Sequence, residues 1–160
     1  MTRRTLDASA DTFQVTRDES GRLVLSGVID ESADLAFFAA LSGHTRIVMS
    51  KVRRVNSYGV RSWIEAVRRV PPGATIELVE CPPSVIDQIN MVAGFVGRGT
   101  VTSFYAPMIC ERCGHERDQL FTVADYHAAG RLPPVACPEC GTTMMVDDLE
   151  EQYLLFTRDG

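Results

Sequence analysis

Apolar and polar positions alternate along the first two thirds of the chain in a way that predicts strands separated by helices. A short strand over residues 13–15 and a longer one over residues 22–29 are separated by the turn residues Ser20 and Gly21. Three further apolar runs bounded by turn residues predict strands over residues 46–50, 75–79 and 100–105.

Helical periodicity predicts three helices between these strands. Leu35, Phe38 and Leu41 form an apolar stripe on the first helix. Either Asn56 or Ser57 supplies the N-cap of the second helix, because each has a side-chain oxygen that accepts from the free backbone N–H groups of the first turn. The third helix opens at residues 82–84.

The third helix is predicted to end at Gly97, and the strand over residues 100–105 follows it. The element order is two strands followed by helix–strand alternation. Such alternation predicts an α/β fold with a mixed sheet that is mostly parallel in its later part, and with helices packed on it.

The balance of charge changes near Pro107. Residues 1–107 carry 12 Arg or Lys and 11 Asp or Glu, whereas residues 108–160 carry 4 Arg and 10 Asp or Glu. We therefore predict a flexible leader over residues 1–12, an α/β domain over residues 13–107 and an acidic domain over residues 108–160. The acidic charge argues against nucleic-acid binding by the last domain.

Neither a secretory signal nor a membrane span is visible in the sequence. Arg3 and Arg4 are followed by polar residues, and no apolar run is long enough to cross a bilayer. We therefore expect a cytoplasmic protein, in which paired Cys-x-x-Cys units indicate metal binding rather than disulfides. Cys81 stands apart from these pairs at the end of a strand-like run, where a buried apolar thiol is expected.

Four cysteines form the strongest chemical signal: Cys110 with Cys113, and Cys137 with Cys140. A glycine follows each pair and lets the chain curl so that backbone N–H groups approach the sulfurs. Two such turns supply a tetrahedral set of four thiolates, which suits one structural zinc ion with no open coordination position. His115 lies beside the first pair, where a role outside the ligand set is expected.

This block resembles a zinc ribbon, and its second half also resembles a rubredoxin knuckle, in which the same ligands hold iron. Zinc is preferred because the insert over residues 121–134 looks helical and carries few aromatics. Residues 144–146 predict a strand. Asp147 and Asp148 are predicted to cap a C-terminal helix whose apolar side packs on the ribbon through Leu149, Tyr153 and Phe156.

The element order over residues 13–105 resembles the STAS domain, the fold of anti-sigma factor antagonists. In that family a strand and a short loop lead to Asp-Ser-Ser-Gly at the start of the next helix. The matching positions here are Asn56, Ser57, Tyr58 and Gly59. Asn56 and Tyr58 therefore depart from the family motif, whereas the serine and the glycine are retained.

The resemblance implies that Ser57 is phosphorylated by a serine kinase that also acts as the anti-sigma factor. A phosphate at a helix N-terminus meets free backbone N–H groups and the positive end of the helix dipole. Arg53 and Arg54 lie just upstream and are candidates to bind it. The alternative is that Ser57 only caps its helix.

No nucleophile with a base, no phosphate-binding loop and no open metal site is visible, and neither His44 nor His127 has an evident acid–base partner. We therefore predict a non-catalytic regulatory protein-interaction module, resembling an anti-sigma factor antagonist, that carries a structural zinc ion. The implied partner is a serine kinase or anti-sigma factor-like protein, and a homo-oligomer is also open. The alternatives are an iron-binding electron carrier and a nucleic-acid-associated factor that uses the basic stretch between Arg46 and Arg69.

Overall fold

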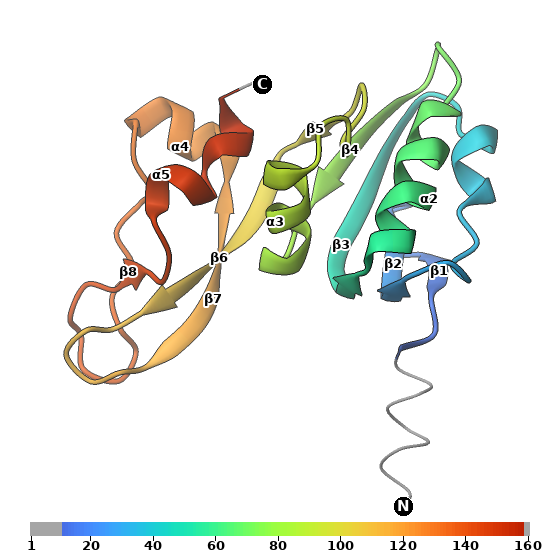
Figure 1. Ribbon diagram of the computed structural model, residues 1–160. Coiled ribbons are helices and arrows are strands. Elements are labelled where there is room, and N and C mark those ends of the chain that lie inside the picture. The colour runs from blue at the N-terminus through green and yellow to red at the C-terminus, as the bar shows by residue number, and fades with distance from the viewer. Residues whose placement is uncertain (1–10, 159–160) are drawn as a thin grey trace, which may run out of the picture.

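The computed structural model describes residues 11–158, which form two β-sheets, one beside the other (Figure 1). The leader predicted over residues 1–12 lies outside the described residues, except for Asp11 and Thr12. The fold is mixed α/β, as predicted. None of the helices formed by residues 11–158 combines the length and the apolar character needed to cross a membrane.

The first sheet has five strands in the order β1-β2-β3-β4-β5. β1 (Gln14–Arg17) pairs antiparallel with β2 (Leu23–Ile29). β2, β3 (His44–Val55), β4 (Thr75–Val79) and β5 (Thr100–Val101) then pair in parallel. This confirms the mixed sheet with a parallel later part, which arises because crossover connections join strands that run the same way.

Strand β3 is longer than predicted, because its pairing with β2 continues through the basic segment after residue 50. Gly27 pairs with Val52 and Val28 pairs with Arg54, so Arg53 is an extra residue in the register. This β-bulge leaves both arginines exposed on the same strand. Two adjacent exposed residues break the alternating pattern, which is why the sequence alone indicated a loop here.

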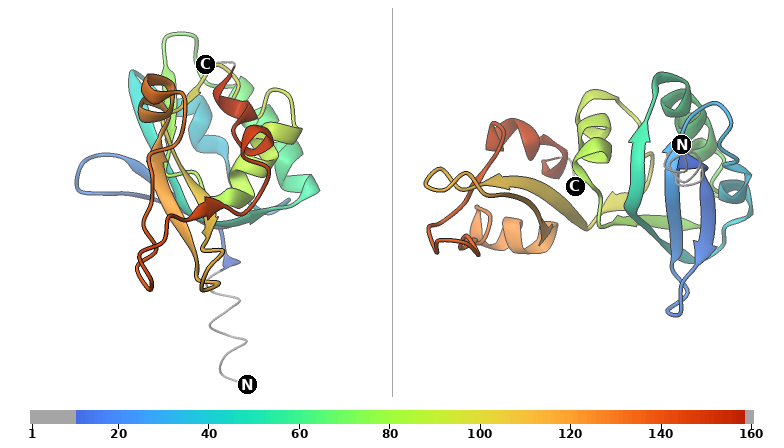
Figure 2. Two further views of the ribbon diagram at one scale, coloured as in Figure 1. Left: turned by 90° about the vertical axis from the view of Figure 1, so that its left-hand side faces the viewer. Right: turned by 90° about the horizontal axis from the view of Figure 1, so that it is seen from below.

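Helices α2 (Ser57–Arg68) and α3 (Pro83–Met91) cover one face of this sheet (Figures 1 and 2). The start of each agrees with prediction, but α3 ends six residues short of the glycine at position 97. Val92 is extended, with φ −118° and ψ 110°. Gly94 then takes a positive φ of 82°, which turns the chain out of the helix.

The first predicted helix is instead a single 3-10 segment, η1 (Ala36–Ala40). Leu35, Phe38 and Leu41 are spaced by three residues, which is the period of a 3-10 helix and also one of the spacings of an α-helical stripe. Phe38 is the buried residue of η1 and meets the ring of Trp63 edge-on, with ring centroids 5.1 Å apart.

Trp63 lies at the centre of the core between the helices and the first sheet. Its side chain is fully buried, and its ring stacks on that of Phe95 at a centroid distance of 5.3 Å. The indole N–H donates a 2.8 Å hydrogen bond to the carbonyl oxygen of Phe95. Because Phe95 lies in the loop after α3, this contact fastens that loop to α2 and satisfies the buried indole N–H.

The second sheet contains β6 (Ser103–Ile109), β7 (Glu116–Thr122) and β8 (Met145–Val146) in the order β7-β6-β8. Both neighbours of β6 are antiparallel to it. The sequence indicated β8 but not β7, because most of the residues that begin β7 are charged and exposed and so give no alternating apolar signal.

The strand predicted over residues 100–105 is divided between the two sheets at Thr102. The Thr102 N–H donates to the carbonyl of Leu78 over 3.1 Å, and Cys81 pairs with Phe104 immediately afterwards. One continuous cluster of buried apolar residues includes members of both sheets. The domain division between residues 107 and 108 stays a prediction, and β6 runs across that position.

Helix α4 (Val123–Ala129) confirms the helix predicted within the insert between the two cysteine pairs. The Thr122 side chain caps it by accepting from the N–H of Asp125 over 3.1 Å. Gly130, with a φ of 72°, ends it.

The C-terminal segment forms α5 (Glu150–Tyr153) and η2 (Leu155–Thr157). The predicted aspartate cap is wrong. Leu149 is the N-cap residue and makes no side-chain cap hydrogen bond, while the Asp148 carboxylate accepts from the Leu149 N–H before the helix begins.

This C-terminal segment packs against the first half of the molecule as well as the second sheet, which the sequence did not indicate. The Asn90 side chain on α3 donates to the carbonyl of Tyr153 over 2.9 Å, and the Tyr153 hydroxyl donates to the carbonyl of Tyr105. Phe156 meets Phe104 edge-on at 5.0 Å. The chain end therefore joins α3 to the second sheet.

Candidate functional site

The first cysteine pair lies in the turn between β6 and β7. The N–H of Gly114 donates to the carbonyl of Cys110 over 2.8 Å, and the N–H of Cys110 donates to the carbonyl of His115 over 2.8 Å. Gly114 has a φ of 78°, a left-handed conformation that favours glycine. These bonds close a tight turn that carries Cys110 and Cys113.

The second cysteine pair repeats this backbone pattern in the loop between α4 and β8. The N–H of Gly141 donates to the carbonyl of Cys137, and the N–H of Cys137 donates to the carbonyl of Thr142, each over 2.8 Å. Gly141 has a φ of 80°. The shared Cys-x-x-Cys-Gly pattern therefore produces the same local turn twice.

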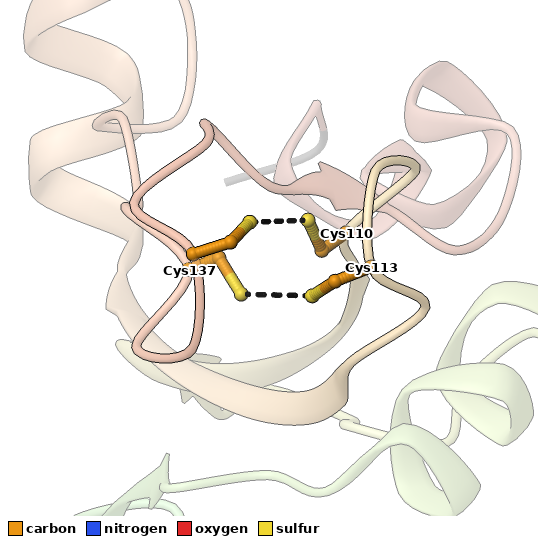
Figure 3. Close-up of side chains that lie close together, drawn as sticks. Cys110, Cys113 and Cys137 are labelled. Atoms are coloured by element: carbon orange, nitrogen blue, oxygen red, sulfur yellow. Dashed lines mark hydrogen bonds between the residues drawn. The ribbon is translucent and has the colours of Figure 1, made fainter.

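The two turns face each other and bring all four sulfurs together (Figure 3). The sulfurs of Cys110 and Cys140 are 3.5 Å apart, and those of Cys113 and Cys137 are 3.6 Å apart. All four sulfur atoms lie within 4.8 Å of one another. The structure thus assembles the four predicted ligands at one point, although the two pairs are separated by 23 residues in the sequence.

This arrangement fits a tetrahedral metal ion. Four sulfurs bound to one zinc ion at about 2.3 Å lie about 3.8 Å from one another, which is close to the spacing seen here. Cys110 and Cys137 are buried, Cys140 is partly buried and Cys113 is exposed. The four cysteines can therefore hold a metal ion near the surface, and a set of four thiolates leaves no position open for a substrate.

The pKa values of two of the clustered thiols are shifted in opposite directions. The hydroxyl and the backbone N–H of Thr142 donate to Cys140 and lower its pKa to about 6. The backbone N–H of His115 lowers the pKa of Cys113, but desolvation and hydrogen bonds with the other three sulfurs outweigh it and raise the pKa to about 12. A metal ion that binds the four sulfurs displaces the protons that the thiols share in these hydrogen bonds.

Sequence reasoning missed Thr142, although a hydroxyl residue two positions after the last cysteine is a usable signal. The corresponding residue after the first pair is His115, whose backbone N–H donates to the sulfur of Cys113. The imidazole of His115 is not part of the four-residue cluster. The expectation that it lies outside the ligand set therefore agrees with the geometry.

The second candidate site is the start of α2. Asn56 is the N-cap residue, and its side-chain oxygen accepts from the N–H of Gly59 over 2.8 Å. Ser57 is exposed, and its hydroxyl makes no hydrogen bond within residues 11–158. Of the two predicted caps, Asn56 is therefore correct. The alternative that Ser57 serves only as the helix cap is wrong.

Gly59 explains how closely this helix start approaches the sheet. A Cβ atom at residue 59 would overlap the carbonyl oxygen of Ile29 at the end of β2. The N–H of Asn56 donates to the same carbonyl over 3.1 Å. The first turn of α2 is thus held against the end of β2, and this leaves Ser57 and Tyr58 facing outwards, with Tyr58 66% exposed.

The two arginines upstream of Ser57 differ in their surroundings. Arg53 forms an ion pair with Asp11 over 3.0 Å. Arg54 is exposed and has no ion-pair partner in the described part of the chain. Arg54 is consequently the freer of the two predicted phosphate-binding side chains. The start of α2 and the four clustered cysteines are two separate sites.

His44 has partners that the sequence did not reveal. One ring nitrogen lies 2.8 Å from the hydroxyl of Thr75, and the other lies 2.8 Å from the carboxylate of Glu77. Burial raises the pKa of Glu77, but hydrogen bonds from Thr102 and His44 and the charge of Arg46 outweigh it and lower the pKa. The expectation that His44 has no acid–base partner is wrong, because the partners lie on the neighbouring strand.

Cys81 lies apart from the four-cysteine cluster, as expected. Its side chain is fully buried in the core, and burial raises the pKa of its thiol. A buried neutral thiol behaves as a small apolar side chain.

Comparisons of this chain with protein-family models, with curated proteins and with solved structures found no match. The resemblance to the STAS family therefore stays a prediction from the element order and the segment from Asn56 to Gly59.

Proposed function

We propose that this protein is a non-catalytic regulatory protein-interaction module with a STAS-like first half and a zinc-ribbon-like second half. The start of α2 is its contact surface for a protein partner. A zinc ion held by the four clustered cysteines supports the second half.

The exposed Ser57 hydroxyl is the single observation that carries the interaction role. Asn56 performs the capping that would otherwise occupy a serine at this position, and Gly59 holds the helix start in place. A phosphate on Ser57 would add negative charge next to the positive end of the α2 dipole and close to Arg54 along the chain. Such a group changes both the charge and the shape of the surface that a partner contacts.

The exposed aromatic ring of Tyr58 supports the same proposal. Aromatic side chains contribute much of the affinity at protein interfaces, and this one is 66% exposed beside the serine. By resemblance, the partner is a serine kinase or an anti-sigma factor-like protein in the cytoplasm. Phosphorylation would then alternate the module between bound and free states.

The proposed zinc ion has a structural role. Its ligands come from the β6–β7 turn and from the loop before β8, and β8 itself pairs with β6 through only two residues. A metal that links the two turns contributes its binding energy to folding, as in other small domains with few apolar residues. Four protein ligands close the coordination shell, so we assign the metal no catalytic role.

Native intact-mass spectrometry of the protein purified from its own host tests both parts in one measurement. We expect one zinc ion per chain and a fraction of molecules heavier by one phosphate, which peptide mapping places on Ser57. The Ser57→Ala variant should lose the phosphorylated species, whereas the Ser62→Ala variant in the same helix should keep it.

Each other outcome has a definite meaning. Zinc without phosphate in every growth condition would remove the switch and leave a constitutive binding module. Iron in place of zinc would overturn the structural role of the metal site and favour electron transfer, because the same thiolate set binds iron.

A further inference from the structure

A groove lies on the metal-binding half of the molecule, away from the start of α2. It has a volume of about 410 Å³ and is bounded by the segment after α4, by β8 and by the residues that lead into α5. Met108, Leu132 and Met144 line it and are buried. Its base is therefore apolar and belongs to the core of the second half.

Two large apolar side chains stand exposed on the walls of this groove. Met145 is 53% exposed and Leu149 is 65% exposed. A single exposed apolar side chain is ordinary on a protein surface. Two of them beside an apolar depression form a continuous surface of the kind that marks a binding site.

The backbone beside this surface is also open. β8 is the edge strand of its sheet, so its outer side has no strand partner among residues 11–158. The Met144 N–H donates to the carbonyl of Val135 over 2.8 Å. Val135 is preceded by Pro133 and Pro134, which have no backbone N–H and so cannot donate to a neighbouring strand. Ala136 also bridges to Thr143, so the edge is covered just before β8, and the part beyond Met144 is left for an incoming chain.

The rim of the groove is acidic. Asp148 and Glu150 line it, and Asp147 and Glu151 adjoin them in the sequence. All four are exposed and have no ion-pair partner among residues 11–158. The carboxyl of Asp87 on α3 has a raised pKa, because of burial and because of the negative charge of Asp148. Asp148 therefore lies near enough to the Asp87 carboxyl for their negative charges to repel each other.

Within the part of the chain that the structure describes, Arg131 is the one cation that lines the groove. The remaining charge around it is negative, so the rim attracts cations and repels nucleic acid and anionic membrane surfaces. A partner that complements both features carries apolar side chains flanked by Lys or Arg.

We propose that this groove binds a basic amphipathic segment of a protein partner. Its apolar side chains lie between Met145 and Leu149, and its Lys or Arg side chains lie next to Asp148 and Glu150. This site is distinct from the start of α2 and does not depend on phosphorylation of Ser57. A protein with both surfaces can join two partners.

The test uses amide chemical shifts of the isotope-labelled full chain in its metal-bound form. Three synthetic peptides of equal length are added separately: one alternates Leu and Lys, one alternates Leu and Glu, and one alternates Ser and Lys. We expect concentration-dependent shifts only with the Leu–Lys peptide, centred on Leu132, Met145, Val146 and Leu149.

Substitutions then locate the contact. The double variant Met145→Glu and Leu149→Glu should raise the Kd for the Leu–Lys peptide by about tenfold or more, the loss expected for removing buried anchors. The variant Met91→Glu is the matched control, because Met91 is 71% exposed on α3 and does not line the groove. It should bind like the wild type. Ser57→Asp should also bind like the wild type, which separates this proposal from the one for α2.

Several results would overturn the proposal. Equal shifts with the Ser–Lys peptide would mean that charge alone is recognised, and shifts centred outside the groove would place binding elsewhere. The absence of shifts at saturating peptide would leave the groove without this role. Concentration-dependent dimerisation that the double variant abolishes would show instead that a second copy of this chain covers the groove.

Discussion

Gly59 lies with its Cα against the backbone carbonyl of Ile29, so close that no side chain fits between helix α2 and the end of β2. This contact ties the first turn of α2, which carries Ser57, to the C-terminal end of a parallel strand. Its consequences for stability are directly measurable.

Replacing Gly59 with alanine should destabilise the protein, because the new methyl group overlaps backbone atoms that cannot move without shifting β2. We expect a loss of about 2–4 kcal/mol in the free energy of unfolding, measured by urea denaturation. Gly73→Ala is the control, since no atom lies within 4 Å of a Cβ built there. Equal effects of the two substitutions would contradict the close contact.

Asn56 and Ser57 should respond differently to alanine. Asn56→Ala removes the side-chain oxygen that accepts from Gly59 and should cost about 1 kcal/mol. Ser57→Ala removes a hydroxyl without a described partner and should change stability by less than about 0.5 kcal/mol. Thermal unfolding of the two variants measures the difference. A larger loss for Ser57→Ala would mean that the serine caps the helix after all.

Removal of the metal should unfold the second half of the molecule. The two turns that carry the cysteines meet at the four sulfurs. Without an ion, the metal–sulfur bonds between the turns are replaced by protons shared among the thiols. We expect a chelator to cause loss of the near-ultraviolet circular dichroism signal and of amide protection in β7 and β8. Re-addition of zinc should restore both.

Substitution of the ligands provides the matched comparison. Cys137→Ser should reduce bound zinc below one ion per chain, measured by elemental analysis, because a serine hydroxyl is a poor ligand for zinc. Cys81→Ala should retain the full amount, since Cys81 is buried outside the cluster. Retention of zinc by Cys137→Ser would remove Cys137 from the ligand set.

Glu77 should make the stability of the first sheet dependent on pH. Its pKa in the folded protein is lowered from the ordinary value of 4.5, so its contribution is present above that value and is lost as the pH falls through the lowered pKa. Glu77→Gln should therefore lower the melting temperature at neutral pH.

The difference between Glu77→Gln and the wild type should shrink below the ordinary pKa of 4.5, where the wild-type carboxyl also becomes neutral. Melting temperatures measured across this pH range provide the check. Glu65→Gln on the exposed face of α2 is the control and should behave like the wild type throughout. A constant difference at every pH would assign the effect of Glu77 to packing instead of charge.

Patterns that are local in the sequence predicted the corresponding structure well. Each Cys-x-x-Cys-Gly unit, together with the residue that follows it, contains all the residues that form its turn, so both turns follow from the sequence. The helix behind Asn56 is similar, because capping and apolar periodicity act within a few residues. The parallel strands were also predictable, since short apolar runs between helices leave few other arrangements.

Features that depend on distant partners were missed. The bulge at Arg53 arises from pairing with β2, and the hydrogen bonds of His44 require β4 beside β3. Likewise, β7 lacks an alternating pattern of its own and becomes a strand by pairing with β6. Pairing of this kind depends on long-range register, which local propensities do not contain.

The sequence alone therefore identified four cysteines able to hold a metal ion, an α/β order of elements and a serine at a helix start. The meeting of the two cysteine pairs, the freedom of the Ser57 hydroxyl and the groove beside Leu149 depended on the folded chain. Ligand identity is a property of residue type and short spacing. The position of one surface relative to another is set by packing between segments that are far apart in the sequence, such as α3 and the C-terminal segment joined through Asn90 and Tyr153.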